Sequence, residues 1–187
     1  MENKSQPDKF KATWVSNSSL RDFLNCPRLY YLRNVYKDPL TKNKLALMEP
    51  PLALGLAVHD ILEKLSSLPT EERLKLPLLA EYKTHFENNF QGEKGGFTSK
   101  SQEGEYFERG RQMIQRVVDN PGPLLNKAIK IKEELPQYWL SEEDEIILCG
   151  KIDWLEYIQE TDSVHIIDFK TSRREEDPDS LQLPIYH

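Results

Sequence analysis

The sequence has few cysteines and no long hydrophobic run. Its two cysteines, Cys26 and Cys149, are too few for a disulfide framework and cannot form a metal site by themselves. No apolar segment approaches the roughly 20 residues that a membrane helix needs, and residues 1–10 lack the apolar core of a signal peptide. The sequence therefore predicts a cytoplasmic protein with no membrane partner.

The chain also lacks the basic excess of proteins that bind nucleic acid mainly through charge, because its net charge is −6. This charge is unevenly distributed. Residues 1–48 hold nine Lys or Arg and four Asp or Glu, so the remaining residues carry a charge of −11. A basic segment beside an acidic body suits an enzyme whose carboxylates bind a metal ion while other residues contact phosphates. On charge alone, a solvated basic surface is the simpler interpretation.

Length and composition are those of a globular protein with one core, since 38% of the 187 residues are hydrophobic and 30% are charged. Residues 1–12 are polar and are predicted to form a disordered tail. Residues 13–187 are predicted to form a single domain. The sequence ends inside its last helix, which begins near Leu181, so the domain is expected to be C-terminally incomplete.

Apolar periodicity predicts helices in the first part of the chain. Between residues 54 and 68, Val58, Ile61, Leu62 and Leu65 repeat at the spacing of one helix face. Pro27 either kinks the first helix or begins a second one. The predicted helices cover residues 20–24, 54–68, 70–90 with an interruption near Pro77, and 106–118.

From about residue 129 the pattern changes to strands. Segments 130–140, 145–158 and 163–171 have strand composition and are separated by short polar turns. A charged loop over residues 173–178 then precedes the last helix. The sequence thus predicts an α/β fold, with a central mixed β-sheet and helices on both of its faces.

Two aspartates are expected to lie side by side in this sheet. If residues 159–162 form a four-residue turn, Asp153 faces Asp168, with Cβ atoms about 5 Å apart, and Lys170 lies on the same face. Like charges in direct opposition destabilise a sheet, and a divalent cation such as Mg²⁺ or Mn²⁺ removes the conflict. If the turn differs, one aspartate is merely solvated at a sheet edge.

Five motifs follow one another along the chain. They are Ser18-x-Leu20 with Cys26-Pro27-Arg28-x-x-Tyr31-Leu32, Gly55-x-x-x-His59, Gly150-Lys151-Ile152-Asp153, Asp168-Phe169-Lys170-Thr171, and Gln182-x-x-x-Tyr186. Their content and order resemble the RecB-like exonuclease branch of the PD-(D/E)XK nuclease superfamily. The resemblance implies a restriction-endonuclease-like core and a metal-dependent deoxyribonuclease, hydrolysing DNA in repair, recombination or CRISPR adaptation.

The resemblance also assigns roles to individual residues. His59, Asp153, Asp168 and the carbonyl oxygen of Phe169 would bind Mg²⁺ or Mn²⁺. Lys170 would position or activate the attacking water and stabilise charge on the phosphate, and Gln182 and Tyr186 would orient Lys170 and the substrate strand. From its spacing alone, His59 would be a surface residue of its helix.

Some relatives, including CRISPR-adaptation nucleases and AddB-type proteins, hold an iron–sulfur cluster through one N-terminal and three C-terminal cysteines. Cys26 stands where the first would be, but this sequence supplies none of the others. A cluster is therefore expected only in a longer parent protein, and Cys-Pro-Arg also occurs in relatives without one.

The implied partners are DNA and a helicase or a CRISPR-adaptation protein. Two other functions remain open at this point. One is a catalytically inactive nuclease-like module that binds DNA or acts as a scaffold, and the other is a metal hydrolase acting on a different phosphoester.

Overall fold

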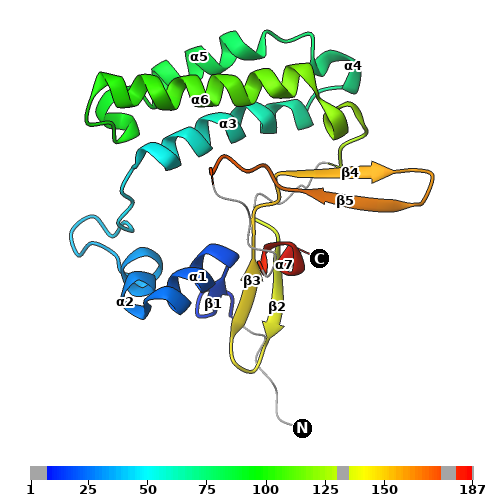
Figure 1. Cartoon of the computed structure of the whole chain (residues 1–187). Helices are drawn as coiled ribbons and strands as arrows, with labels where there is room; N and C mark the ends of the chain where they lie inside the picture. Colours follow the sequence, from blue (N-terminus) through cyan, green and yellow to red (C-terminus); the bar gives the residue numbers. More distant parts are fainter. Residues whose placement is uncertain (1–7, 130–134, 174–179, 187) are drawn as a thin grey trace. The chain divides into compact units, whose positions relative to one another are not determined.

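The computed structural model describes residues 8–129, 135–173 and 180–186, and these residues form two compact units (Figure 1). The first unit contains residues 8–46, 135–151 and 180–186, and the second contains residues 47–129 and 152–173. The single domain predicted for residues 13–187 stays a prediction. The tail predicted over residues 1–12 lies partly outside the described residues, and Asp8 to Ala12 form a turn in which two backbone N–H groups donate to the Asp8 carbonyl.

The first unit contains a three-stranded mixed sheet. Strand β1 (Thr13–Val15) runs parallel to β3 (Ile146–Cys149), and β2 (Gln137–Ser141) pairs with the other edge of β3 in antiparallel orientation. Strand β1 was not predicted, because three residues are too short for an alternating pattern to be recognised. The N-terminal part of the predicted strand 130–140 lies outside the described residues.

Local sequence signals explain where two helices of the first unit begin. Helix α1 (Asn17–Asn25) starts with a capping box in which Ser16 and Ser19 exchange side-chain to backbone hydrogen bonds of 2.8 and 3.2 Å. Pro27 begins the separate helix α2 (Pro27–Tyr30), which continues into a π-helical segment (Tyr31–Val35). Proline suits this first position because its missing N–H has no helical partner there. The last helix is α7 (Gln182–Tyr186).

The second unit is mainly helical. It contains α3 (Pro50–Ser66), α4 (Thr70–Arg73), α5 (Leu78–Asn89) and α6 (Lys100–Asp119), with 3-10 turns at Gly92–Gly95 and Gly122–Leu125. The predicted interruption near Pro77 is confirmed as the gap between α4 and α5. Helices α3, α5 and α6 contact one another and lie side by side in Figure 1. No helix within the described ranges is long and apolar enough to cross a bilayer.

An aromatic cluster forms the centre of the helical core. Phe86 is 1% exposed, and its ring centroid lies 5.3–6.3 Å from those of four other aromatic rings. Gly110 allows α6 to approach α5 closely, because a Cβ there would clash with the Tyr82 ring. Burial raises the pKa of the Tyr82 hydroxyl, which donates a 3.2 Å hydrogen bond to the Phe107 carbonyl. The core thus fixes α3, α5 and α6 against one another.

Strands β4 (Trp154–Ile158) and β5 (Ser163–Ile167) form an antiparallel hairpin in the second unit. The α/β class with a mixed sheet and flanking helices is confirmed, but the described strands belong to two sheets rather than one. The segment predicted as one strand over residues 145–158 breaks between Cys149 and Trp154. Its intervening residues include glycine, lysine and aspartate, which are depleted in strands.

Candidate functional site

The carboxylate of Asp153 joins two separate parts of the second unit. Its Oδ1 lies 3.0 Å from Nδ1 of His59 on α3, and its Oδ2 accepts a 2.8 Å hydrogen bond from the Phe169 N–H. The Asp153 side chain is only 11% exposed. Because a carboxylate oxygen only accepts, Nδ1 of His59 carries the proton of this contact, and in the neutral ring Nε2 then holds the lone pair. The structure therefore brings the histidine motif and the two aspartate motifs into contact.

Asp168 and Lys170 form a second charged pair. Oδ2 of Asp168 lies 2.7 Å from Nζ of Lys170, and their side chains are 13% and 40% exposed. A mostly buried carboxylate is thus compensated by an ammonium group that remains accessible to solvent. The side chains of residues 168 and 170 were expected on one face, and this ion pair agrees with that expectation.

The predicted hairpin register is confirmed as far as the strands extend. Ile158 pairs with Ser163, and Trp154 pairs with Ile167. The next pair, Asp153 with Asp168, lies just outside the ladder, so the expectation of a direct cross-strand pair is wrong. The Asp153 side chain takes the Phe169 N–H instead. Each carboxylate has a donor or a cation of its own, which offsets the repulsion expected between two like charges.

The four predicted metal-binding residues are only partly assembled. His59 and Asp153 are in contact, whereas the Asp168 carboxylate is engaged by Lys170. Within the described residues, no group of three His, Cys, Asp or Glu side chains is arranged so that it could hold a metal ion. The chemistry of the donor set nevertheless suits a hard divalent cation, because it combines two mostly buried carboxylates with one imidazole. The ligand assignment stays a prediction.

Trp154 anchors the chain directly after Asp153. It is 2% exposed, and its ring packs under the guanidinium of Arg73, whose Cζ lies 5.0 Å from the ring centroid. Burial lowers the pKa of this guanidinium. Arg73 was not singled out from the sequence, because the neighbouring residues do not reveal partners that are 51 and 53 residues away. It donates hydrogen bonds of 2.6–3.1 Å to the carbonyl oxygens of Leu68, Leu124 and Asn126.

The two other predicted site residues lie on α7 in the first unit. The amide nitrogen of Gln182 donates a 3.2 Å hydrogen bond to the Tyr186 hydroxyl. The Tyr186 ring packs against the backbone of Gly150, where an added Cβ would overlap it. The last motif therefore contacts the start of the motif that carries Asp153, and glycine is needed at the point of contact.

Replacing Gly150 with Ala is expected to destabilise the protein by about 1 kcal/mol, because the new methyl group displaces the Tyr186 ring. The same replacement in a Tyr186→Ala background should cost almost nothing. Chemical denaturation of the wild type, both single variants and the double variant measures this coupling. Equal costs in both backgrounds would mean that Tyr186 does not contact Gly150 in solution.

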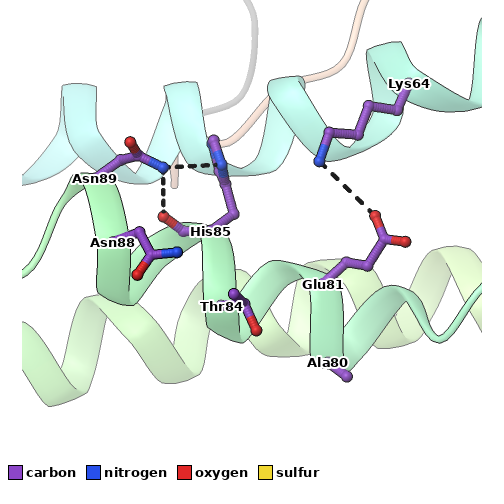
Figure 2. Close-up of a pocket in the computed structure, with 7 residues that line it drawn as sticks. All are labelled: Lys64, Ala80, Glu81, Thr84, His85, Asn88 and Asn89. Atoms are coloured by element: carbon purple, nitrogen blue, oxygen red, sulfur yellow. Dashed lines mark hydrogen bonds and ion pairs between the residues drawn. The ribbon is translucent and has the colours of Figure 1, made fainter.

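A shallow pocket of about 510 Å³ lies on the second unit, and none of the residues predicted for catalysis lines it (Figure 2). Within it, Asn89 contacts both the ring and the carbonyl of His85, and Lys64 lies 3.8 Å from Glu81. His85 also contacts Asp60 on α3 at 2.8 Å. These contacts tie α5 to α3. The pocket is lined by Lys64, Ala80, Glu81, Thr84, His85, Asn88 and Asn89.

The two cysteines differ in their surroundings. Cys26 is exposed at the junction of α1 and α2, and Cys149 is buried at the end of β3. Burial raises the pKa of the Cys149 thiol, which disfavours the thiolate that metal binding requires. Cys149 thus fills a small buried apolar position, and Cys26 is accessible.

Comparison with known proteins gives a match at the level of a protein family. The family model described as the PD-(D/E)XK nuclease superfamily matches residues 15–187, which include every residue predicted for the site. No match was found among curated proteins or among solved structures. The match reaches the level of the superfamily and does not distinguish its branches.

Proposed function

The chain belongs to the PD-(D/E)XK nuclease superfamily, and on that premise we propose that it is a Mg²⁺- or Mn²⁺-dependent DNA exonuclease. The superfamily consists of hydrolases that cleave phosphodiester bonds. The substrate, the metal ion, the mode of attack and the RecB-like branch are the further steps of this proposal. The observation that carries it is the mostly buried Asp153 carboxylate, which holds His59 on one side and the Phe169 N–H on the other.

His59 and Asp153 support a metal centre through their mutual geometry. Nδ1 of His59 and Oδ1 of Asp153, two of the proposed ligand atoms, lie 3.0 Å apart and share the Nδ1 proton. Because metal ligands must give up their protons on binding, a divalent cation would replace this proton and be held by both residues. Together with Asp168 and the Phe169 carbonyl, these groups would hold the ion. A bound divalent cation would act as a Lewis acid on a phosphoryl oxygen and lower the pKa of an attacking water.

Lys170 supplies the positive group of the site. Its ammonium is held 2.7 Å from Asp168, and the side chain is 40% exposed, so a phosphate arriving from solvent can reach it. There it would stabilise the negative charge that develops on the phosphate and orient the attacking water. A DNA-binding module without activity has no need for this arrangement of carboxylates and lysine. A helicase or a CRISPR-adaptation protein is the protein partner that we propose.

Cleavage assays on EDTA-treated protein test this function. We expect end-labelled linear DNA to be degraded after Mg²⁺ or Mn²⁺ is added, circular single-stranded DNA of the same composition to stay intact, and EDTA to stop the reaction. A preparation of Asp168→Ala controls for contaminating nucleases. Binding of DNA without cleavage under any cation would favour the inactive module, and turnover of small phosphodiesters or nucleotides alone would favour a different hydrolase.

A further inference from the structure

Two arginines near the candidate site are paired with carboxylates. Arg111 makes two hydrogen bonds of 2.7 Å to the Glu108 carboxylate on the same helix. Arg173 lies 2.7 Å from Glu105. Arg109, also on α6, differs from both, because within the described residues it makes no ion pair with a carboxylate. Its charge is therefore not neutralised by that part of the chain.

The guanidinium of Arg109 is held in place next to the proposed catalytic segment. It stacks over the Tyr106 ring, with its Cζ 4.9 Å from the ring centroid, and Nη2 donates a 3.3 Å hydrogen bond to the Thr171 carbonyl. Thr171 directly follows Lys170 in the sequence. The side chain is neither fully buried nor fully exposed, so part of it remains accessible.

The segment that Arg109 contacts is itself fixed from a second side. Thr171 packs against Gly55 on α3, where an added Cβ would lie 3.5 Å from the threonine hydroxyl oxygen. The chain leaving Lys170 thus lies against α3 through Thr171 and against α6 through Arg109. The Arg109 guanidinium is therefore hydrogen-bonded to the residue that directly follows Lys170.

A guanidinium has five N–H donors in a planar fork that matches two oxygens of a phosphate. Only one donor of Arg109 has a hydrogen-bond partner within the described residues. Stacking on Tyr106 orients the plane before any ligand arrives, which lowers the entropy lost on binding. Arg109 is therefore a pre-oriented cation with donors available for an anion.

We propose that Arg109 binds a phosphate of the DNA strand that neighbours the phosphate cleaved at Lys170. This inference rests on the proposed nuclease function and adds a substrate contact to it. Arg109 touches the substrate strand but not the reacting atoms, so it sets the register of the strand relative to Asp168 and Lys170.

The test is the salt dependence of DNA binding, measured by fluorescence anisotropy with a labelled single-stranded oligonucleotide in Ca²⁺ buffer. Each phosphate contact contributes about 0.7 to the slope of log K against log salt for a single strand. Arg109→Gln should lower this slope by about 0.7 and weaken binding about fivefold at 0.1 M salt, which is the change that this slope corresponds to. Arg109→Lys should retain the slope because it retains the charge.

Arg116→Gln is the matched control, because it removes the same charge from an exposed position on the same helix. It should leave both slope and affinity unchanged. A second experiment changes the substrate instead of the protein: one phosphate beside the scissile one is replaced by a neutral methylphosphonate. Wild-type protein should bind the methylphosphonate strand more weakly than the unmodified strand. Arg109→Gln should bind the two strands equally, so that the effects of the two changes are not additive.

Each outcome decides between explanations. A lower slope for Arg109→Gln, with an unchanged slope for Arg116→Gln, supports the phosphate contact. An unchanged slope with a lower kcat would mean that Arg109 only positions Thr171, and the inference would fail while the nuclease function stands. If the wild type binds no DNA at all, the proposed function fails together with the inference. If Arg109→Gln does not fold, full affinity of the wild type for the methylphosphonate strand at every neighbouring position overturns the inference.

Discussion

Replacing Asp153, Asp168 or Lys170 with Ala is expected to reduce DNA cleavage by about 10³-fold or more, because each supplies a charge that acts on the reacting phosphate. Binding of DNA should change little, since most of its affinity comes from phosphates outside the reacting centre. Single-turnover cleavage with excess enzyme measures the chemical step, and anisotropy measures binding on the same preparations.

His59→Ala serves as a graded comparison within the same site. One imidazole contributes less than the two carboxylates, so this variant should retain more activity than the other three when Mn²⁺ is supplied. The His59→Ala change also leaves the Asp153 carboxylate without its imidazole partner, so thermal melts should accompany the assay. Full activity in any of the Asp153, Asp168 or Lys170 variants would overturn the site assignment.

Phe86→Ala is expected to destabilise the second unit by about 3–5 kcal/mol, because it removes a fully buried ring from the centre of the aromatic cluster. For a chain of this length the melting temperature should fall by roughly 6–20 °C. Differential scanning calorimetry measures the change. Thr84→Ala, at an exposed position on the same helix, should stay within about 0.5 kcal/mol of the wild type. If both variants lost similar amounts of stability, Phe86 would not be at the centre of the core.

The helices and the hairpin could be predicted because their signals are local. The apolar repeat from Val58 to Leu65 identifies α3, and these residues are buried in the structure. The four-residue turn between Ile158 and Ser163 sets the pairing of β4 with β5, because register follows directly from loop length. The resemblance to known motifs then selected His59 among four histidines.

The contacts that build the site were less accessible to sequence reasoning. His59 and Asp153 lie 94 residues apart, and their spacing says nothing of which oxygen meets which nitrogen. The position where β4 begins depends on Trp154 entering the core beneath Arg73, a tertiary contact. The predicted register was therefore correct, but the prediction placed one further pair, Asp153 with Asp168, in a ladder that ends at Trp154 and Ile167. Arg109 was missed for the same reason, since its partner Thr171 is 62 residues away.

The most direct test of the metal centre is the thermal shift that Mn²⁺ produces in wild-type protein and in Asp153→Asn, without any substrate. At a hundred times its dissociation constant, an ion that binds only the folded protein stabilises it by about 2.7 kcal/mol. The wild type should show a shift of this size, and Asp153→Asn should lose most of it, because an amide oxygen replaces the charged ligand shared with His59 and Phe169. Equal shifts in the two proteins would mean that the ion binds elsewhere and would contradict the account.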